Sequence, residues 1–457
     1  MRDFTANELV EKIWAHDASL WTSSGEEKWL GWLDAPTRSL AQASETLAFA
    51  ERALDGVENV LLLGMGGSSL APEVMRLAFG STTFHVLDST HPSAVRRLAS
   101  ELDPASTFVL VSSKSGSTIE TRSHLDYFWA WANEQGGRFA AVTDPGSDLE
   151  KLARERGFLQ VLAGEPTIGG RFSALSPFGI VPAALMGVDI ERLLLRAGEM
   201  AEACRGVDGN PGLELGLELG EGWREGHDKV CIPEHESGFA LWAEQLIAES
   251  TGKQGKGLVP APGEHPGDTD RQAVELRIEN AYELAQEMFR WEFAVAVAGA
   301  LLEINPFDQP NVQEAKDRTK AILDSGAEPD LAHSGSLDEL LASARAGDYI
   351  AILAFVDPTP ENDARLAALA KRAGETTGCV VTRGFGPRYL HSTGQLHKGG
   401  KPNGLFVQVV DDLGEELAIP GRDFGFRRLI GAQAAGDFAA LEEHGRPVVR
   451  IGLEEEL

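Results

Sequence analysis

Two segments of this 457-residue sequence combine glycine with hydroxyl side chains directly after an apolar run. Glycine lets the backbone approach a ligand closely, and the free N–H groups at the start of a helix attract anions. Hydroxyl donors and such amides can hold a phosphate with few cations. The purely structural alternatives are a tight turn for the first segment and, for the second, a helix cap completed by Glu120. The segments are Gly64-Met65-Gly66-Gly67-Ser68-Ser69 and Ser112-Ser113-Lys114-Ser115-Gly116-Ser117-Thr118-Ile119-Glu120-Thr121.

Three further segments carry charged residues with a chemical use. Arg171 follows two glycines and could face a cleft, although a surface arginine in a loop is the commoner case. Glu249 stands near the end of a predicted helix, where the helix dipole would raise the pKa of its carboxyl and suit it to remove a proton alpha to a carbonyl. The alternative is an exposed glutamate. Lys316 follows Ile304-Asn305-Pro306-Phe307-Asp308-Gln309, with an exposed helix lysine as its alternative.

A glycine-rich polar segment near the C-terminus holds two histidines, His391 and His397. Ordinary loop hydrogen bonding and acid–base chemistry are both compatible with the pair. The segment is Gly384-Phe385-Gly386-Pro387-Arg388-Tyr389-Leu390-His391-Ser392-Thr393-Gly394-Gln395-Leu396-His397-Lys398.

The elements that position these residues follow an alternating pattern. Continuous apolar strands separated by helices indicate a parallel sheet covered on both faces, with ligands outside the carboxyl ends of the strands. We therefore predict an α/β fold of doubly wound parallel sheets, with two αβ subdomains and a smaller C-terminal αβ segment. The expected strands are 60–64, 84–88, 108–112, 139–143 and 159–162, then 230–233, and finally 349–355, 379–382 and 405–410. The expected helices are 69–79, 91–102, 117–134, 147–156, 288–302 and 359–374.

The same pattern predicts the domain organisation. We expect a helical lead-in at 1–44, a first αβ domain at 45–168, a helix-rich second domain at 169–326 and a C-terminal αβ segment at 337–457, after a polar linker.

Composition excludes several classes of function. Lysine and arginine number 41 against 70 aspartate and glutamate, a net charge of −29, which argues against nucleic acid and anionic membranes as partners. No apolar stretch is long enough for a membrane helix, and the N-terminus lacks a leader pattern. The three cysteines suggest neither a disulfide framework nor a zinc site, so we expect a cytoplasmic protein without metal or cofactor.

Five of these segments, in this order, resemble the glucose-6-phosphate isomerase family, whose phosphate site lies in a sugar-isomerase domain. The 384–400 segment resembles the isomerase half of transaldolase–isomerase fusion proteins. Two positions depart from the family pattern: Ser115 stands where threonine is usual, and Gly116 where an aromatic residue is common. The resemblance implies that the substrate phosphate is held by Gly67, Ser68, Ser113, Lys114, Ser115, Thr118 and Thr121.

The resemblance also implies a reaction: reversible conversion of glucose 6-phosphate to fructose 6-phosphate by ring opening and proton transfer through a cis-enediolate. Glu249 would be the base, Arg171 would stabilise the enediolate and Lys316 would assist ring opening. The family's acid–base histidine has Asp270 at its position here, beside His235 and His265 in sequence; His391 and His397 are further candidates, and we favour His391 because it lies in a dense polar loop.

The expected partner is a small hexose phosphate, and the family implies a homodimer. Two alternatives stay open: a dual phosphoglucose/phosphomannose isomerase, and a non-catalytic phosphosugar-binding protein.

Overall fold

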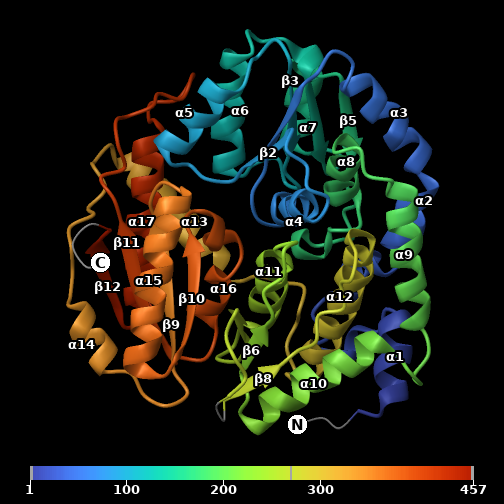
Figure 1. The fold of residues 1–457 in the computed structure, drawn as a ribbon, viewed down its shortest axis with the longest axis vertical. Coiled ribbons are helices and arrows are strands. Elements are labelled where there is room, and N and C mark those ends of the chain that lie inside the picture. Colours follow the sequence, from blue (N-terminus) through green and yellow to red (C-terminus); the bar gives the residue numbers. More distant parts are fainter. Residues whose placement is uncertain (1–3, 268–269, 454–457) are drawn as a thin grey trace.

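Three parallel sheets form the framework of the protein, seen here in a computed structural model that describes residues 4–267 and 270–453. In Figure 1 the N-terminal sheet lies at the top, the C-terminal sheet at the lower left and the small middle sheet at the bottom centre, with its helices extending to the lower right. The parallel α/β fold expected from the sequence is confirmed. The expected domain boundaries stay predictions.

The N-terminal sheet has the order β2-β1-β3-β4-β5, and each of its strands coincides with one of the five apolar runs. Alternate residues point to opposite faces, so Leu62 and Leu110 join one core and Leu61 and Val109 another. Both faces are therefore buried, which explains the continuous apolar runs. The strands are β1 Asn59–Leu63, β2 Phe84–Leu87, β3 Thr107–Ser112, β4 Phe139–Thr143 and β5 Gln160–Ala163.

Helices follow the strands of this sheet, and the four expected there are confirmed at slightly shorter lengths. The elements of the first half are α1 Ala6–Trp14, α2 Ala35–Ala41, α3 Ala43–Ala53, α4 Leu70–Ala78, α5 Pro92–Glu101, α6 Ile119–Trp131, α7 Asp148–Glu155 and α8 Pro177–Leu185. Short 3-10 turns occur at 18–20, 26–29, 31–34, 66–68, 136–138 and 170–172.

The middle region is helix-rich around a sheet of order β7-β6-β8. The sequence predicted only its central strand, so the two edge strands are a correction: β7 is half proline and β8 has three residues. The expected buried helix is confirmed as α12. The elements are α9 Ile190–Ala203, α10 Pro211–Glu225, β6 Lys229–Ile232, α11 Phe239–Thr251, β7 Val259–Pro262, β8 Arg271–Ala273, α12 Leu284–Leu301 and α13 Val312–Ser325, with a 3-10 turn at 281–283.

The C-terminal sheet has the order β10-β9-β11-β12, and its last strand and last helix were not expected from the sequence. The elements are α14 Leu337–Ala342, β9 Tyr349–Phe355, α15 Pro360–Thr377, β10 Val380–Phe385, α16 Gly394–Gly399, β11 Gly404–Val410, α17 Phe426–Glu443 and β12 Val448–Gly452, with a 3-10 turn at 388–391.

Helix α17 links the N-terminal and C-terminal sheets by packing against both. Its residues Phe426 and Leu429 pack into the same core as Val109 and Val111 of the N-terminal sheet, and α13 lies against it. The loop after β10 thereby comes to lie over the carboxyl edge of the N-terminal sheet, where it meets the two polar turns.

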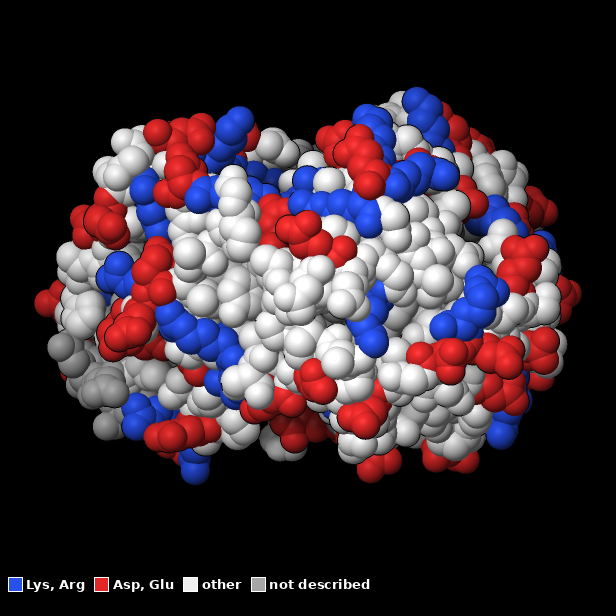
Figure 2. Space-filling model, turned by 90° about the horizontal axis from the view of Figure 1, so that it is seen from above, with Lys and Arg blue, Asp and Glu red and all other residues white. Residues whose placement is uncertain are grey.

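Charge is unevenly spread over the surface. The face shown in Figure 2 has acidic and basic groups mixed around its rim and a largely uncharged middle. Among the described helices, none is long and apolar enough to cross a membrane.

Candidate active site

A cavity of about 340 Å³ opens at the carboxyl ends of the N-terminal strands. The strand-to-helix turns after β1 and β3 form one side, and segments from the middle and C-terminal regions form the other. Every residue that the sequence assigned to the site lines this cavity: Gly67, Ser68, Ser113, Lys114, Ser115, Thr118, Thr121, Arg171, Glu249, Lys316 and His391.

The turn after β3 presents hydroxyl groups to the cavity. Thr118 is the N-cap of α6, but its side chain makes no capping hydrogen bond. The hydroxyl of Thr121 is buried and has no hydrogen-bond partner among the described residues. The structural alternative, a helix cap completed by Glu120, is therefore not seen, and hydroxyls beside a helix N-terminus remain available to an anion.

Lys114 is held rather than free. Its Nζ lies 2.6 Å from Asp144 Oδ2 and donates to the carbonyl of Glu165 at 2.9 Å. The ion pair fixes the loop, so an anion here would rely mainly on hydroxyl and backbone donors.

The turn after β1 touches the arginine loop. A Cβ built on Gly67 would stand 2.0 Å from the carbonyl oxygen of Gly170. Gly66 has a φ of +58°, which glycine adopts readily. Only residues without a side chain let the two loops meet, and this contact holds Arg171 at the cavity.

Arg171 is buried and bonded on several sides. Its Nε donates to Ser250 Oγ at 2.8 Å, and its Nη2 donates to the carbonyls of Pro306 and Asp308 at 2.7 and 2.9 Å. Its Nη1 lies 3.4 Å from Glu249 Oε1. Burial lowers the pKa of Arg171 while the charges of Glu249 and Asp308 oppose that effect. The guanidinium is thus a fixed cation beside the carboxylate.

Lys253 supports the same loop. This buried lysine donates to the carbonyl of Asn305 and to the side chain of Asp308, both at 2.8 Å. Burial, followed by the charge of Arg171, lowers the pKa of Lys253 to about 8. It therefore holds the 305–308 carbonyls in place for Arg171.

Glu249 lies in the last turn of α11, as expected, and is 8% exposed. Gln245, one turn earlier on the same helix face, donates from Nε2 to Glu249 Oε2 at 3.0 Å and to the backbone carbonyl of His391 at 2.8 Å. Sequence reasoning missed Gln245, although its spacing of four from Glu249 was a usable signal.

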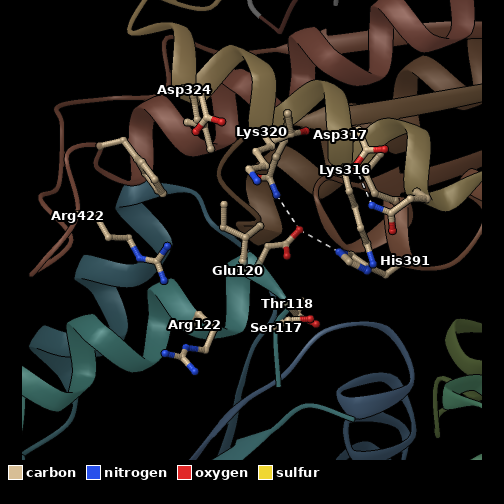
Figure 3. A pocket seen from close by; sticks show the side chains of 17 residues that line it. Ser117, Thr118, Glu120, Arg122, Lys316, Asp317, Lys320, Asp324, His391 and Arg422 are labelled. Carbon is tan, nitrogen blue, oxygen red and sulfur yellow. Dashed lines mark hydrogen bonds and ion pairs between the residues drawn. The ribbon is translucent and has the colours of Figure 1, made fainter. Parts of the chain in front are cut away.

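His391 is the candidate histidine that the fold brings to the cavity. Its Nε2 lies 2.9 Å from Glu120 Oε1, and Gln433 donates to the same oxygen at 2.7 Å (Figure 3). Burial alone would raise the pKa of Glu120, but the charge and hydrogen bond of His391 outweigh it and the pKa lies below its ordinary value. Glu120 is thus an ionised group that orients His391.

The other candidates lie elsewhere. His397 is buried against Tyr349, with its Nδ1 3.1 Å from the phenol oxygen. Asp270, at the family's histidine position, lies 3.2 Å from Lys229. His235 lies 2.8 Å from Ser237, also away from the cavity.

Lys316 reaches the cavity from α13 and makes no ion pair among the described residues. The cavity therefore combines a hydroxyl-rich anion corner, a carboxylate beside a fixed arginine, and a lysine near a carboxylate-oriented histidine. That set can bind a phosphorylated substrate and move a proton next to a carbonyl.

Several known proteins resemble this chain in sequence. Residues 33–205 match the family model Phosphoglucose isomerase. A glucose-6-phosphate isomerase of Thermus thermophilus is 35% identical over 265 residues, which cover 54% of this chain and 63% of that protein. One from Nostoc is 36% identical and covers 48% and 47%. One from Rubrobacter xylanophilus is 28% identical and covers 63% and 87%. The matches to the first relatives span about half to just under two thirds of those proteins' length.

Solved structures share the fold. A glucose-6-phosphate isomerase from Chlamydia trachomatis superposes with a TM-score of 0.53 at 19% identity, covering 70% of this chain and 78% of that one. A hypothetical protein from Thermus thermophilus superposes with a TM-score of 0.50 at 22% identity, covering 98% and 83%.

Proposed function

We propose that this chain, whose residues 33–205 match the family model Phosphoglucose isomerase and whose relatives are glucose-6-phosphate isomerases, interconverts glucose 6-phosphate and fructose 6-phosphate. The observation that carries the proposal is the cavity that gathers all eleven residues predicted for this chemistry. They come from regions of sequence as far apart as Gly67 and His391.

The residues divide the reaction between them. The turns after β1 and β3 would hold the phosphate through Ser68, Ser113, Ser115 and the amides at the start of α6. Lys316 and His391 would move the protons that open the sugar ring. These assignments use groups that line one cavity and can act on one bound ligand.

Proton transfer would follow in the opened sugar. Glu249 would remove the proton from C2 and return it to C1, and the negative charge that develops on the enediolate oxygen would be stabilised by Arg171. Arg171 suits this role because its bonds to Ser250 and two carbonyls fix its position before the charge appears.

The test is turnover by the purified chain and by Glu249→Gln. Fructose 6-phosphate is supplied and glucose 6-phosphate is followed through a coupled dehydrogenase. We expect the variant to lose at least ~100-fold in kcat, within the usual contribution of a general base, with KM changed less than ~3-fold. Exposed Glu134→Gln is the matched control.

Three results would separate this proposal from its alternatives. Equal turnover of mannose 6-phosphate would identify a dual isomerase. Saturable binding without turnover by the parent chain would identify a phosphosugar-binding protein. Full activity in Glu249→Gln would refute the base assignment while leaving the isomerase.

We further propose a cytoplasmic homodimer. The three cysteines Cys204, Cys231 and Cys379 are free and buried, as a reducing compartment allows. Light scattering of the purified chain measures the oligomeric state: a mass near one chain would refute the dimer.

A further inference from the structure

A second chamber of about 480 Å³ adjoins the candidate active site. Thr118, Lys316 and His391 line both cavities and so form a shared wall. The chamber lies between the start of α6 and α13 (Figure 3). Gln433 of α17 also lines it and donates a hydrogen bond to Glu120. No step of the proposed reaction uses it.

The two helices present matching residues one turn apart. On α6, Thr118 faces both cavities and Arg122 faces the second chamber; on α13, Lys316 faces both and Lys320 faces the second chamber. Residues four apart share a helix face at an axial separation of about 6 Å. About one helical turn outward from Thr118 and Lys316, the chamber thus has two cationic side chains, Arg122 and Lys320.

Two cations of this chamber have no ion-pair partner among the described residues. Neither Arg122 nor Lys320 forms an ion pair or hydrogen bond within the described parts of the chain. The nearby carboxylate of Asp126 is already engaged by Arg156 at 3.2 Å and Arg422 at 3.1 Å.

The chamber holds charges of both signs. Its lining has four cations and three carboxylates: Arg122, Lys316, Lys320, Arg422, Glu120, Asp317 and Asp324. Burial lowers the pKa of Arg122, the charges of Asp126 and Asp148 oppose that effect, and the charges of Arg422 and Arg156 lower the pKa further. Arg122 and Lys320 have no carboxylate in an ion pair among the described residues, so an anion in the chamber could pair with them.

We propose that this chamber is a second anion site, separate from the substrate phosphate site, that binds inorganic phosphate or a small phosphate monoester with the help of Lys320 and Arg122, which line it from α13 and α6. Arg122 suits a phosphate because its guanidinium offers planar paired donors, and Lys320 supplies a mobile charge from the facing helix. A ligand here would contact the wall that carries Lys316 and His391.

Binding is tested by equilibrium dialysis of the full chain against radiolabelled inorganic phosphate. The parent chain should bind about two phosphates per chain. Arg122→Gln/Lys320→Gln should lose one of them, with at least tenfold weaker affinity at that site, whereas Ser113→Ala/Ser115→Ala should lose the other. Lys28→Gln/Lys371→Gln removes the same charge from exposed positions and should still bind both.

One phosphate per chain in the parent, or two in Arg122→Gln/Lys320→Gln, would overturn the proposal. Binding of inorganic phosphate shows that the second site accepts a phosphate group. Repeating the dialysis with a labelled phosphate monoester distinguishes inorganic phosphate from an organic phosphate as the ligand, because a monoester that displaces phosphate at the second site also fits there. Because dialysis needs no turnover, these outcomes do not depend on the isomerase assignment.

A kinetic consequence rests on the proposed function. With fructose 6-phosphate saturating, phosphate should lower kcat in the parent chain because it occupies the chamber beside Lys316 and His391. Arg122→Gln/Lys320→Gln should keep its basal kcat and lose this inhibition. A purely competitive effect in the parent would refute the link to the reaction while leaving the binding site to the dialysis result.

Discussion

Replacing Glu120 by glutamine tests whether this buried carboxylate orients His391 for ring opening. Glu120 is 4% exposed and accepts hydrogen bonds from His391 and Gln433 on one oxygen, Oε1. A glutamine has nearly the same shape but no charge. Its amide oxygen can accept from either donor, so the change removes the ion pair with His391 and keeps the packing.

The expected loss follows from that contact. A hydrogen bond to a charged group contributes about 1.5–3 kcal/mol, and a tenfold rate change corresponds to about 1.4 kcal/mol. We therefore expect kcat for glucose 6-phosphate to fall by about 10- to 150-fold. Removal of the imidazole in His391→Ala should cost more, up to the ~10⁴-fold that a general acid can contribute.

The assay compares a substrate that must open its ring with one that cannot form a ring. A four-carbon aldose 4-phosphate has its ring-forming hydroxyl blocked by the phosphate. Exchange of its C2 proton with deuterated water, followed by NMR, reports proton transfer without ring opening. Glu120→Gln should lose turnover of glucose 6-phosphate while the exchange rate stays within ~3-fold of the parent.

Equal loss of both reactions would refute the assigned role, because Glu120 would then act on proton transfer or on the fold as a whole. Gln433→Met is the matched control: it removes the other hydrogen bond to Glu120 and leaves His391 paired. Because the folded pKa of Glu120 is lowered, its ionised carboxylate contributes stability that is present above pH 4.5 and is lost as the pH falls through the folded pKa. Glu120→Gln should therefore unfold with less pH dependence in acid than the parent.

Three further substitutions test the structure around the site and in the core. Gly67→Ala places a Cβ 2.0 Å from the Gly170 carbonyl oxygen. It should abolish turnover and lower the free energy of unfolding in urea by about 1–3 kcal/mol. Gly137→Ala is the control, because Gly137 has open space around it and its replacement should change neither quantity; an active Gly67→Ala would refute the contact between the loops. Lys253→Met should reduce kcat because Arg171 would be held less firmly. The folded pKa of Lys253 is about 8, below the unfolded value of 10.5, so the lysine makes the free energy of unfolding of the parent increase as the pH rises from about 8 to 10.5. Urea unfolding of the variant should lack this increase. Glu292→Leu removes a buried carboxyl whose two oxygens have no hydrogen-bond partner among the described residues. Burial raises the pKa of this carboxyl well above 4.5. The substitution should stabilise the protein by about 1–3 kcal/mol, more at high than at low pH, and a less stable variant at pH ~9 would contradict this interpretation.

The fold could be predicted wherever burial left a local pattern. The central strands β1, β3 and β4 of the N-terminal sheet are covered on both faces, so their apolar runs stand out. The strand β7 is hidden by two prolines in Val259–Pro262, and β8 has only three residues. Helix α17 was not predicted, because one side of it covers the N-terminal sheet while another packs on α13. Its sequence therefore shows no single apolar stripe.

A site residue could be predicted where the residues next to it in the sequence already indicate its role. Glu249, Arg171 and Lys316 follow that rule. Glu120 did not, because a glutamate in a first helical turn has an ordinary local explanation as a cap. Its actual partner, His391, is 271 positions away, and no local pattern reports such a contact. The turn between β1 and α4, by contrast, could be predicted from its own glycines, Gly64, Gly66 and Gly67.

The distance along the chain between Glu120 and His391 also bears on how the protein acquires activity as it folds. Contacts between residues far apart require large loops to close, and chains rich in such contacts fold slowly. Arg171 and Gln309, 138 positions apart, add a second long closure at the same cavity. During refolding from denaturant, helical circular dichroism should therefore return before turnover, and the regain of catalysis should mark the last association of the N-terminal sheet with the C-terminal loop.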